Sequence, residues 1–169
     1  MRIELHTSAG LITLELEAEK APLSTANFAS YVTAGHYDGL VFHRVIPNFM
    51  VQGGGFDTKG VQRKANAGIK NEWKNGLSNR KYTVAMARLG NQPDSGSCQF
   101  FINVADNDFL DQPRDGAGYA VFGKIVGGID IVDAIAGMPT SIKNGMQDWP
   151  RQDVVINKAV SRPSPAKSV

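Results

Sequence analysis

The strongest constraint on the fold is a repeated alternation of apolar and polar residues in short segments. Residues 2–7 (RIELHT) and 11–16 (LITLEL) both alternate with a period of two, and residues 8–10 (SAG) between them suit a short turn. This period is typical of a strand with one buried face, so the pair predicts a β-hairpin. Further strands are predicted at 40–46, 49–52, 83–87, 99–104, 119–126 and 154–160.

Two other segments have helical spacing instead. In residues 22–34, apolar side chains such as Phe28 and Val32 recur every three to four positions, and residues 129–135 repeat the pattern before Gly137. About eight short strands and two helices, one near each third of the chain, predict an all-β fold. The pattern alone is compatible with either a barrel or a sandwich that carries capping helices.

Length and charge limit what kind of protein this is. The chain has 169 residues, which suits one domain, and we expect that domain over 1–161 with a disordered tail at 162–169. A net charge of +2 is too small to predict nucleic-acid or membrane binding. Cys98 is the single cysteine, so no intrachain disulfide can form. No signal peptide is visible, and we expect a cytoplasmic protein.

Several common reaction chemistries find no support in the residues. The stretch 118–124 (GYAVFGK) matches part of a phosphate-binding loop, but Ile125 stands where a serine or threonine must hold magnesium. Residues 106–108 (DND) lack the glycine and the terminal glutamate of a calcium loop. The three histidines are not at metal-ligand spacing from one another. We therefore expect no metal site and no cofactor.

Two positions break the pattern of the strands on which they lie. Arg44 interrupts an otherwise apolar strand, which costs free energy unless the charge is paired or reaches an open face. In 99–104, alternation places Phe101 on the same face as Gln99 and Asn103. Two interpretations of that face stay open at this point: a strand buried on both sides, or a binding surface.

These segments also resemble a known family. Residues 42–54 (FHRVIPNFMVQGG), 99–102 (QFFI) and 119–124 (YAVFGK) are similar to motifs of the cyclophilin-type peptidyl-prolyl cis-trans isomerases, with bacterial members the most similar. The resemblance runs from about residue 2 to residue 160. It implies a closed eight-stranded antiparallel β-barrel with a helix over each open end.

The resemblance also implies an active site. It places the family's catalytic arginine at Arg44, beside an apolar pocket for the proline ring. The other catalytic groups fall on Phe49, Gln52 and Gln99, and the substrate-binding groups on His43, Met50, Ala87, Arg88, Phe101, Phe109, Leu110 and Tyr119. The function implied is rotation about X-Pro peptide bonds in polypeptides, which assists protein folding.

The chain departs from many eukaryotic members at three of these positions. They have tryptophan where Phe109 stands, histidine where Tyr119 stands and asparagine where Arg88 stands. Since the resemblance implies that the tryptophan contributes to cyclosporin binding, we expect cyclosporin to bind with reduced affinity. Nothing in the sequence demands a dimer, so we expect a monomer that binds proline-containing polypeptides.

A second class of function competes with the enzyme. A non-catalytic proline-peptide-binding or chaperone module could use the same fold and pocket without needing Arg44. The arginine and both glutamines are present, which favours the isomerase. A barrel that carries a small ligand inside is disfavoured, because inward positions such as Ile3, Leu5, Ile12 and Leu14 are bulky enough to fill it.

Overall fold

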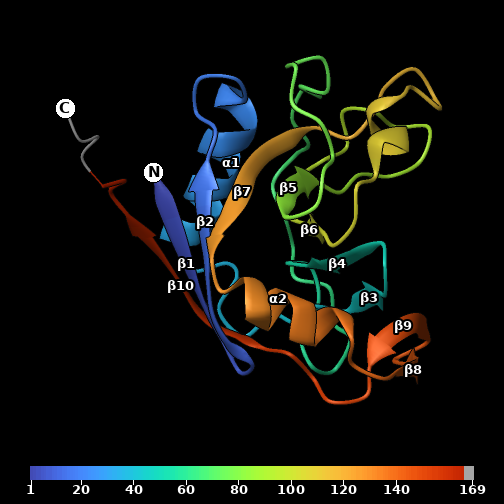
Figure 1. Ribbon diagram of the computed structural model, residues 1–169. Helices are drawn as coiled ribbons and strands as arrows, with labels where there is room; N and C mark the ends of the chain where they lie inside the picture. Colours follow the sequence, from blue (N-terminus) through green and yellow to red (C-terminus); the bar gives the residue numbers. More distant parts are fainter. Residues whose placement is uncertain (166–169) are drawn as a thin grey trace.

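The computed structural model describes residues 1–165 and contains one curled antiparallel sheet of eight strands (Figure 1). The hairpin expected at the N-terminus is confirmed. The spatial order of the strands is β10 (Ile156–Arg162), β1 (Arg2–Thr7), β2 (Gly10–Leu16), β7 (Val121–Gly127), β5 (Thr83–Met86), β6 (Phe100–Asn103), β4 (Met50–Gly53) and β3 (Arg44–Ile46).

The two edges of the sheet meet through a short β-bridge, so the prediction of a closed barrel slightly overstated the closure. The edge strands β10 and β3 do not pair with each other; the segments that precede them do. Gly39 N donates to Ile156 O (2.8 Å), Ile156 N donates to Leu40 O (2.8 Å) and Phe42 N donates to Val154 O (3.1 Å). These bonds satisfy backbone groups that would otherwise lie unpaired at the seam.

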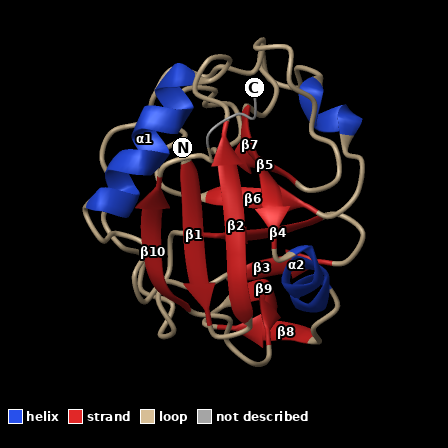
Figure 2. Ribbon diagram, turned by 60° about the vertical axis from the view of Figure 1, so that its left-hand side comes forward, coloured by secondary structure: helices blue, strands red, loops and turns tan. Residues whose placement is uncertain are grey.

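Two helices cap the sheet, as the spacing predicted. Helix α1 (Pro22–Thr33) packs against β10 and β7, and α2 (Ile129–Ala136) packs against β2, β3 and β4. Figure 2 shows them at opposite ends of the sheet. Proline suits the first turn of α1, because the amide it lacks would have no partner within the helix there.

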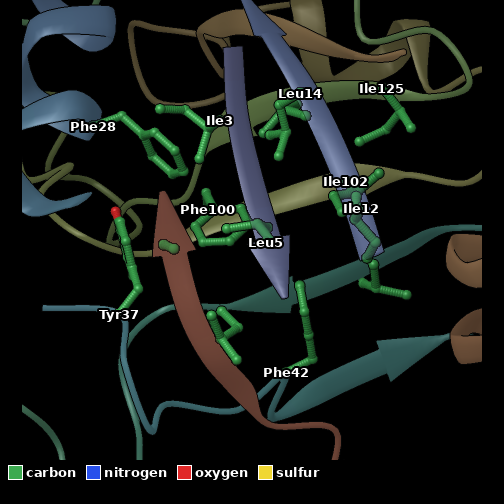
Figure 3. Close-up of a cluster of buried hydrophobic side chains, with 14 of the residues drawn as sticks. Ile3, Leu5, Ile12, Leu14, Phe28, Tyr37, Phe42, Phe100, Ile102 and Ile125 are labelled. Atoms are coloured by element: carbon green, nitrogen blue, oxygen red, sulfur yellow. The ribbon is translucent and has the colours of Figure 1, made fainter. Parts of the chain in front are cut away.

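Large side chains fill the interior of the barrel (Figure 3). Ile3 and Leu5 of β1 are completely buried, as are Ile12 and Leu14 of β2. Phe28 of α1 packs onto them from one end, together with the aromatic rings of Tyr37, Phe100 and Phe122. These side chains occupy the interior of the barrel, and the hollows described below lie on its outer surface.

Three features of the fold were not predicted. A second hairpin, β8 (Thr140–Lys143) and β9 (Met146–Pro150), turns at Asn144-Gly145, where both residues have positive φ. The Asn-Gly pair is a strong signal for such a turn, and it was overlooked. A 3₁₀-helix, η1, covers Asp108–Asp111. Strand β10 extends to Arg162, where we expected the tail to begin; residues 166–169 of that tail lie outside the described residues.

None of the helices in residues 1–165 combines the length and the apolar character needed to cross a membrane.

The aromatic packing between α1 and the sheet generates the first prediction. Phe28 is 1% exposed, and its ring centroid lies 5.1 to 5.2 Å from those of Tyr37, Phe100 and Phe122. Removing that ring leaves a cavity, so Phe28→Ala should lower the free energy of unfolding by about 3–5 kcal/mol. Leu23→Ala, on the same helix but 47% exposed, is the matched control. Urea unfolding that gives equal losses for both variants would contradict this account.

Candidate active site

Strand β6 packs on both of its faces. Phe100 and Ile102 point into the barrel core, whereas Phe101 points outward and is only 4% exposed. A second, smaller apolar cluster buries it on the outer side of the sheet; its buried members are Met50, Ala85, Phe101, Leu110 and Val121. Both interpretations of the outward face therefore hold in part, because this cluster is buried and also forms the floor of an open groove.

The groove above this cluster has a volume of about 340 Å³. Apolar side chains form its floor and walls, and polar groups stand at its edge. It is lined by Arg44, Phe49, Met50, Gln52, Ala87, Arg88, Phe101, Leu110, Arg114 and Tyr119. The structure thus brings together, around one groove, nine of the twelve residues that the sequence singled out.

A row of polar side chains crosses the edge of the groove. Arg44 and Gln52 stand directly opposite each other on β3 and β4, so their side chains share one face. Arg44 Nη1 donates to Gln52 Oε1 (3.3 Å), and Gln52 Nε2 donates to Gln99 Oε1 (3.0 Å). Gly55 makes room for this arrangement, since a Cβ there would lie 2.5 Å from Gln99 Nε2.

The guanidinium of Arg44 is exposed and has no acidic partner. In residues 1–165, no carboxylate oxygen lies within 4 Å of its nitrogens. Its one side-chain hydrogen bond, to Gln52, is a long one to a neutral group. A full positive charge therefore lies beside an apolar groove. From the sequence, we expected Arg44 either to be paired or to reach an open face, and the structure shows the second arrangement.

A second hollow adjoins the groove. It has a volume of about 210 Å³ and shares Gln52, Ala87 and Arg88 with the first. Gln99 lines this second hollow rather than the first. Ala87, just beyond the end of β5, donates its amide to Gln99 O (3.1 Å). Gln52 therefore lines both hollows, and its hydrogen-bond partner Gln99 lines the second.

The side chain of Arg88 holds two loops together. Its guanidinium is 2% exposed and donates to both oxygens of Asp115 (3.0 and 2.6 Å), as well as to the carbonyl oxygens of Ala117 and Gly118. The bonds from Arg88 hold the pKa of Asp115 at about 2. These bonds occupy the guanidinium of Arg88, so its side chain connects the two loops.

Comparison with known proteins gives the same result over nearly the whole chain. The family model described as cyclophilin type peptidyl-prolyl cis-trans isomerase/CLD matches residues 2–161. The chain belongs to the cyclophilin family. It is therefore an enzyme, a peptidyl-prolyl cis-trans isomerase, and the expected eight-stranded antiparallel fold with two helices is that of its structural relatives.

Two bacterial relatives and one solved structure illustrate the similarity. A peptidyl-prolyl cis-trans isomerase of Acinetobacter baylyi is 54% identical over 91% of this chain and 81% of its own length. Peptidyl-prolyl cis-trans isomerase B of Escherichia coli is 45% identical over 91% of this chain and 95% of its own. A Cryptosporidium parvum cyclophilin, crystallised in the presence of the dipeptide Ala-Pro, superposes with a TM-score of 0.78 at 22% identity and covers 97% of this chain and 100% of its own.

One of the expected rim residues of this cyclophilin lies elsewhere. His43 precedes Arg44 in an extended segment, so the two side chains point to opposite sides. Its ring is 6% exposed and packs against Phe56 (4.7 Å between centroids) and Trp149 (6.1 Å). The structure therefore does not bring His43 to the groove. Burial, followed by the positive charge of Arg44, lowers the pKa of His43 to about 4.

Phe109 and Tyr119, two of the expected rim residues, each contact an aromatic residue that lines the groove. Phe109 follows the first residue of η1, is 46% exposed and stacks on Phe49 with 5.9 Å between ring centroids. It does not line the groove itself but extends the wall that Phe49 forms. The ring of Tyr119 meets that of Phe101 edge-on at 5.9 Å, and the guanidinium of Arg88 lies 4.7 Å above it. The two aromatic rings that replace the eukaryotic residues therefore both rest on groove residues.

Three buried asparagines, none of which was predicted as a site residue, form hydrogen bonds behind the groove. Asn107 Nδ2 donates to Phe49 O and to Asn103 Oδ1 (2.8 Å each), and Asn103 Nδ2 donates to Asn79 Oδ1 (3.0 Å). Asn79 Nδ2 in turn donates to Tyr119 O (3.0 Å). The network fixes the backbone behind two walls of the groove. Asn103, a polar residue in an apolar strand, was the one available signal; Asn79 lies in a long loop and gave none.

The low pKa of His43 predicts how stability changes with pH. Between pH 6.5 and 4 the unfolded chain protonates this histidine and the folded chain does not, so stability falls as the pH falls through that window. The full effect is on the order of 3 kcal/mol. Between pH 7 and pH 4.5, the free energy of unfolding of His43→Gln should fall by about 2–3 kcal/mol less than that of the wild type, as measured by urea unfolding.

The comparison between variants isolates His43, because other titrating groups are shared. His36, whose pKa is also lowered by burial, is present in both proteins. Leu23→Ala, which removes an exposed side chain that does not titrate, provides the control and should keep the wild-type pH dependence of stability. If the free energy of unfolding of His43→Gln followed pH in parallel with that of the wild type, the buried imidazole would contribute nothing to the pH dependence.

Proposed function

We propose that the groove between β3, β4, β6 and η1 is where the X-Pro bond is isomerised, and that Arg44 is the group that lowers the barrier. One observation carries this proposal. The guanidinium of Arg44, which has no acidic partner among residues 1–165, stands beside an apolar hollow of about 340 Å³ on the outer face of the barrel.

The reaction needs little from the enzyme. Amide resonance sets a rotational barrier of roughly 18–20 kcal/mol, and uncatalysed X-Pro exchange takes tens to hundreds of seconds. Each tenfold acceleration requires about 1.36 kcal/mol, so ordinary turnover requires on the order of 6 kcal/mol. No covalent bond is made or broken. Electrostatic stabilisation of the twisted amide by positioned groups is sufficient for a barrier reduction of that size.

Arg44 acts on the charge that develops during rotation. As the amide twists, the nitrogen lone pair loses conjugation and becomes a better hydrogen-bond acceptor. A guanidinium donor aimed at that nitrogen therefore binds the twisted state more strongly than the planar one, which is the condition for catalysis. Arginine suits the role because it stays protonated at every working pH and because its planar fork can bond to Gln52 and to substrate together.

The apolar side of the groove fixes the ring while the peptide turns. Phe49, Met50, Phe101 and Leu110 present surface of the size and polarity that a pyrrolidine ring requires and exclude the water that favours the polar, planar ground state. Gln52 orients Arg44, and Gln99 stands where a rotating carbonyl on the N-terminal side of the proline would pass. The Ala-Pro dipeptide present with the C. parvum cyclophilin supports a proline-containing peptide as the ligand of this fold.

A non-catalytic chaperone or peptide-binding module is the alternative use of the same groove. Such a module would need the apolar wall but not the free guanidinium. The register that places Arg44 opposite Gln52, and the bond from Gln52 to Gln99, favour the enzyme, because mere binding would leave this polar row without a purpose.

The catalytic role of Arg44 is tested by its removal. Arg44→Ala should lower kcat/KM for a short X-Pro peptide by about 100-fold or more, since it deletes a charge-assisted bond made only in the twisted state. Because Arg44 is exposed, the thermal transition of the Arg44→Ala variant should shift by no more than about 2 °C. A protease-coupled assay and calorimetry measure the two quantities. Arg151→Ala, at an exposed arginine after β9, is the control; near-normal turnover of Arg44→Ala would remove Arg44 from the mechanism.

We also propose that this cyclophilin acts as a cytoplasmic monomer and binds cyclosporin with reduced affinity. The buried Cys98 and the absence of any disulfide partner for it in the sequence support a reducing compartment. Phe109 supports the weak drug binding, since it offers a smaller ring than tryptophan and no donor. Light scattering of the purified protein tests the monomer.

Replacing the rim residue tests the drug proposal. Phe109→Trp should bind cyclosporin about tenfold more tightly, because the indole adds apolar area and an N–H donor at an exposed rim. Calorimetric titration measures the affinity, and Phe109→Leu serves as a control that should bind no more tightly than the wild type. A tryptophan variant with unchanged affinity would place the cause of weak binding elsewhere in the groove.

A further inference from the structure

We propose that the active-site groove prefers substrates with an acidic side chain on the residue that follows proline, and that Arg114 is the residue that binds this carboxylate. The inference deepens the proposed function and rests on it. Neither the motifs of the sequence nor the expected site residues include Arg114, which lies in the loop between η1 and β7.

Arg114 is held over the groove by an aromatic ring. Its side chain lines the hollow of about 340 Å³, and its guanidinium carbon lies 5.5 Å from the centroid of the Phe109 ring. That ring in turn stacks on Phe49. A guanidinium over an aromatic face keeps its edge free for hydrogen bonds, so the charge of this exposed residue is both positioned and available.

The groove carries an uncompensated positive charge. Three arginines line it, and none of its lining residues is acidic. Asp115 neutralises Arg88, but within residues 1–165 no carboxylate oxygen lies within 4 Å of a nitrogen of Arg44 or Arg114. Two positive charges without partners therefore face the site, and a bound carboxylate would find a complementary potential.

The acidic residues close to the loop are engaged in other contacts. Asp111 accepts hydrogen bonds from Ser78 Oγ and from both the backbone and the side chain of Asn79. Asp108 pairs with Arg80 at 3.8 Å. These contacts direct both carboxylates to residues outside the groove, so neither of them competes with a substrate for Arg114.

The loop that bears Arg114 is anchored directly beside it. The carboxylate of Asp115 binds the buried guanidinium of Arg88 and also accepts from the backbone amide of Asn91 (2.6 Å). Two loops are thereby tied together one residue from Arg114. This anchoring reduces the conformational freedom that a surface arginine would otherwise lose on binding a substrate.

The position of Arg114 selects the side of the proline. In the proposed mechanism the N-terminal part of the substrate moves past Gln52 and Gln99, toward the second hollow. Arg114 lines the first hollow and not the second. The chain that leaves the proline on its C-terminal side therefore runs toward Arg114, which places the acidic side chain immediately after the proline.

Peptides that differ at one residue test the preference. NMR exchange spectroscopy on Ala-Ala-Pro-Asp-Ala, Ala-Ala-Pro-Lys-Ala and Ala-Ala-Pro-Ala-Ala gives kcat/KM without a coupling protease. The wild type should favour the aspartate peptide over the lysine peptide by about three- to tenfold, and added salt should reduce that ratio. Arg114→Gln should bring the ratio toward one, and Arg114→Glu should invert it.

Two controls separate this effect from general ones. Lys158→Gln removes the same charge from an exposed position on β10, at the far edge of the sheet, and should keep the wild-type ratio. Each variant is compared with itself on different peptides, so a general loss of activity or stability cancels from the ratio. When the aspartate or lysine stands before the proline instead of after it, the ratio of kcat/KM between the two peptides should be smaller.

A wild-type ratio near one would overturn the inference, and so would an Arg114→Glu variant that still favours aspartate. Both results leave the proposed function intact, because the wild type would still accelerate exchange in all three peptides. Failure of the wild type to accelerate exchange in any of them would instead overturn the proposed function, and this inference with it.

Discussion

Strand β6 must be packed on both faces at once, and the position of the active site depends on that constraint. Its inward residues Phe100 and Ile102 belong to the barrel core and are completely buried there. Its outward residue Phe101 needs a second apolar cluster, which the sheet obtains from Met50 and from Leu110 of η1. This outer cluster forms the floor of an apolar groove that is open to solvent, and we propose that the chemistry takes place there.

The arginines of the groove show how one residue type is given different tasks by its partners. The guanidinium of Arg88 is buried and hydrogen-bonded to Asp115 and to backbone carbonyls, so this side chain connects two loops. Arg44 is exposed and bonded only to a neutral amide, so its charge remains available to a twisting peptide. Arg114 lies between these cases, held by a ring rather than by an acid.

The sequence predicts the frame of this protein well, because period-two and helical spacing report burial directly. The N-terminal hairpin, both helices and the outward position of Phe101 were all predicted. His43 was carried over with its neighbours by motif, yet simple alternation next to Arg44 would have placed it on the opposite side. The supports of the groove were harder to foresee. Asn79, Arg114 and Asp115 lie in irregular loops, where spacing carries no information about which way a side chain points.

The central claim is that Arg44 stabilises the twisted amide and not the bound peptide as such. NMR line-shape analysis of an Ala-Pro peptide with the wild type and with Arg44→Lys separates the two, since it yields both the dissociation constant and the cis-trans exchange rate on the enzyme. The account predicts an on-enzyme rate at least about tenfold slower in the lysine variant, because lysine keeps the charge but loses the planar fork, with a dissociation constant within about threefold of the wild type. A larger dissociation constant for the lysine variant, with an unchanged exchange rate on the enzyme, would contradict the account.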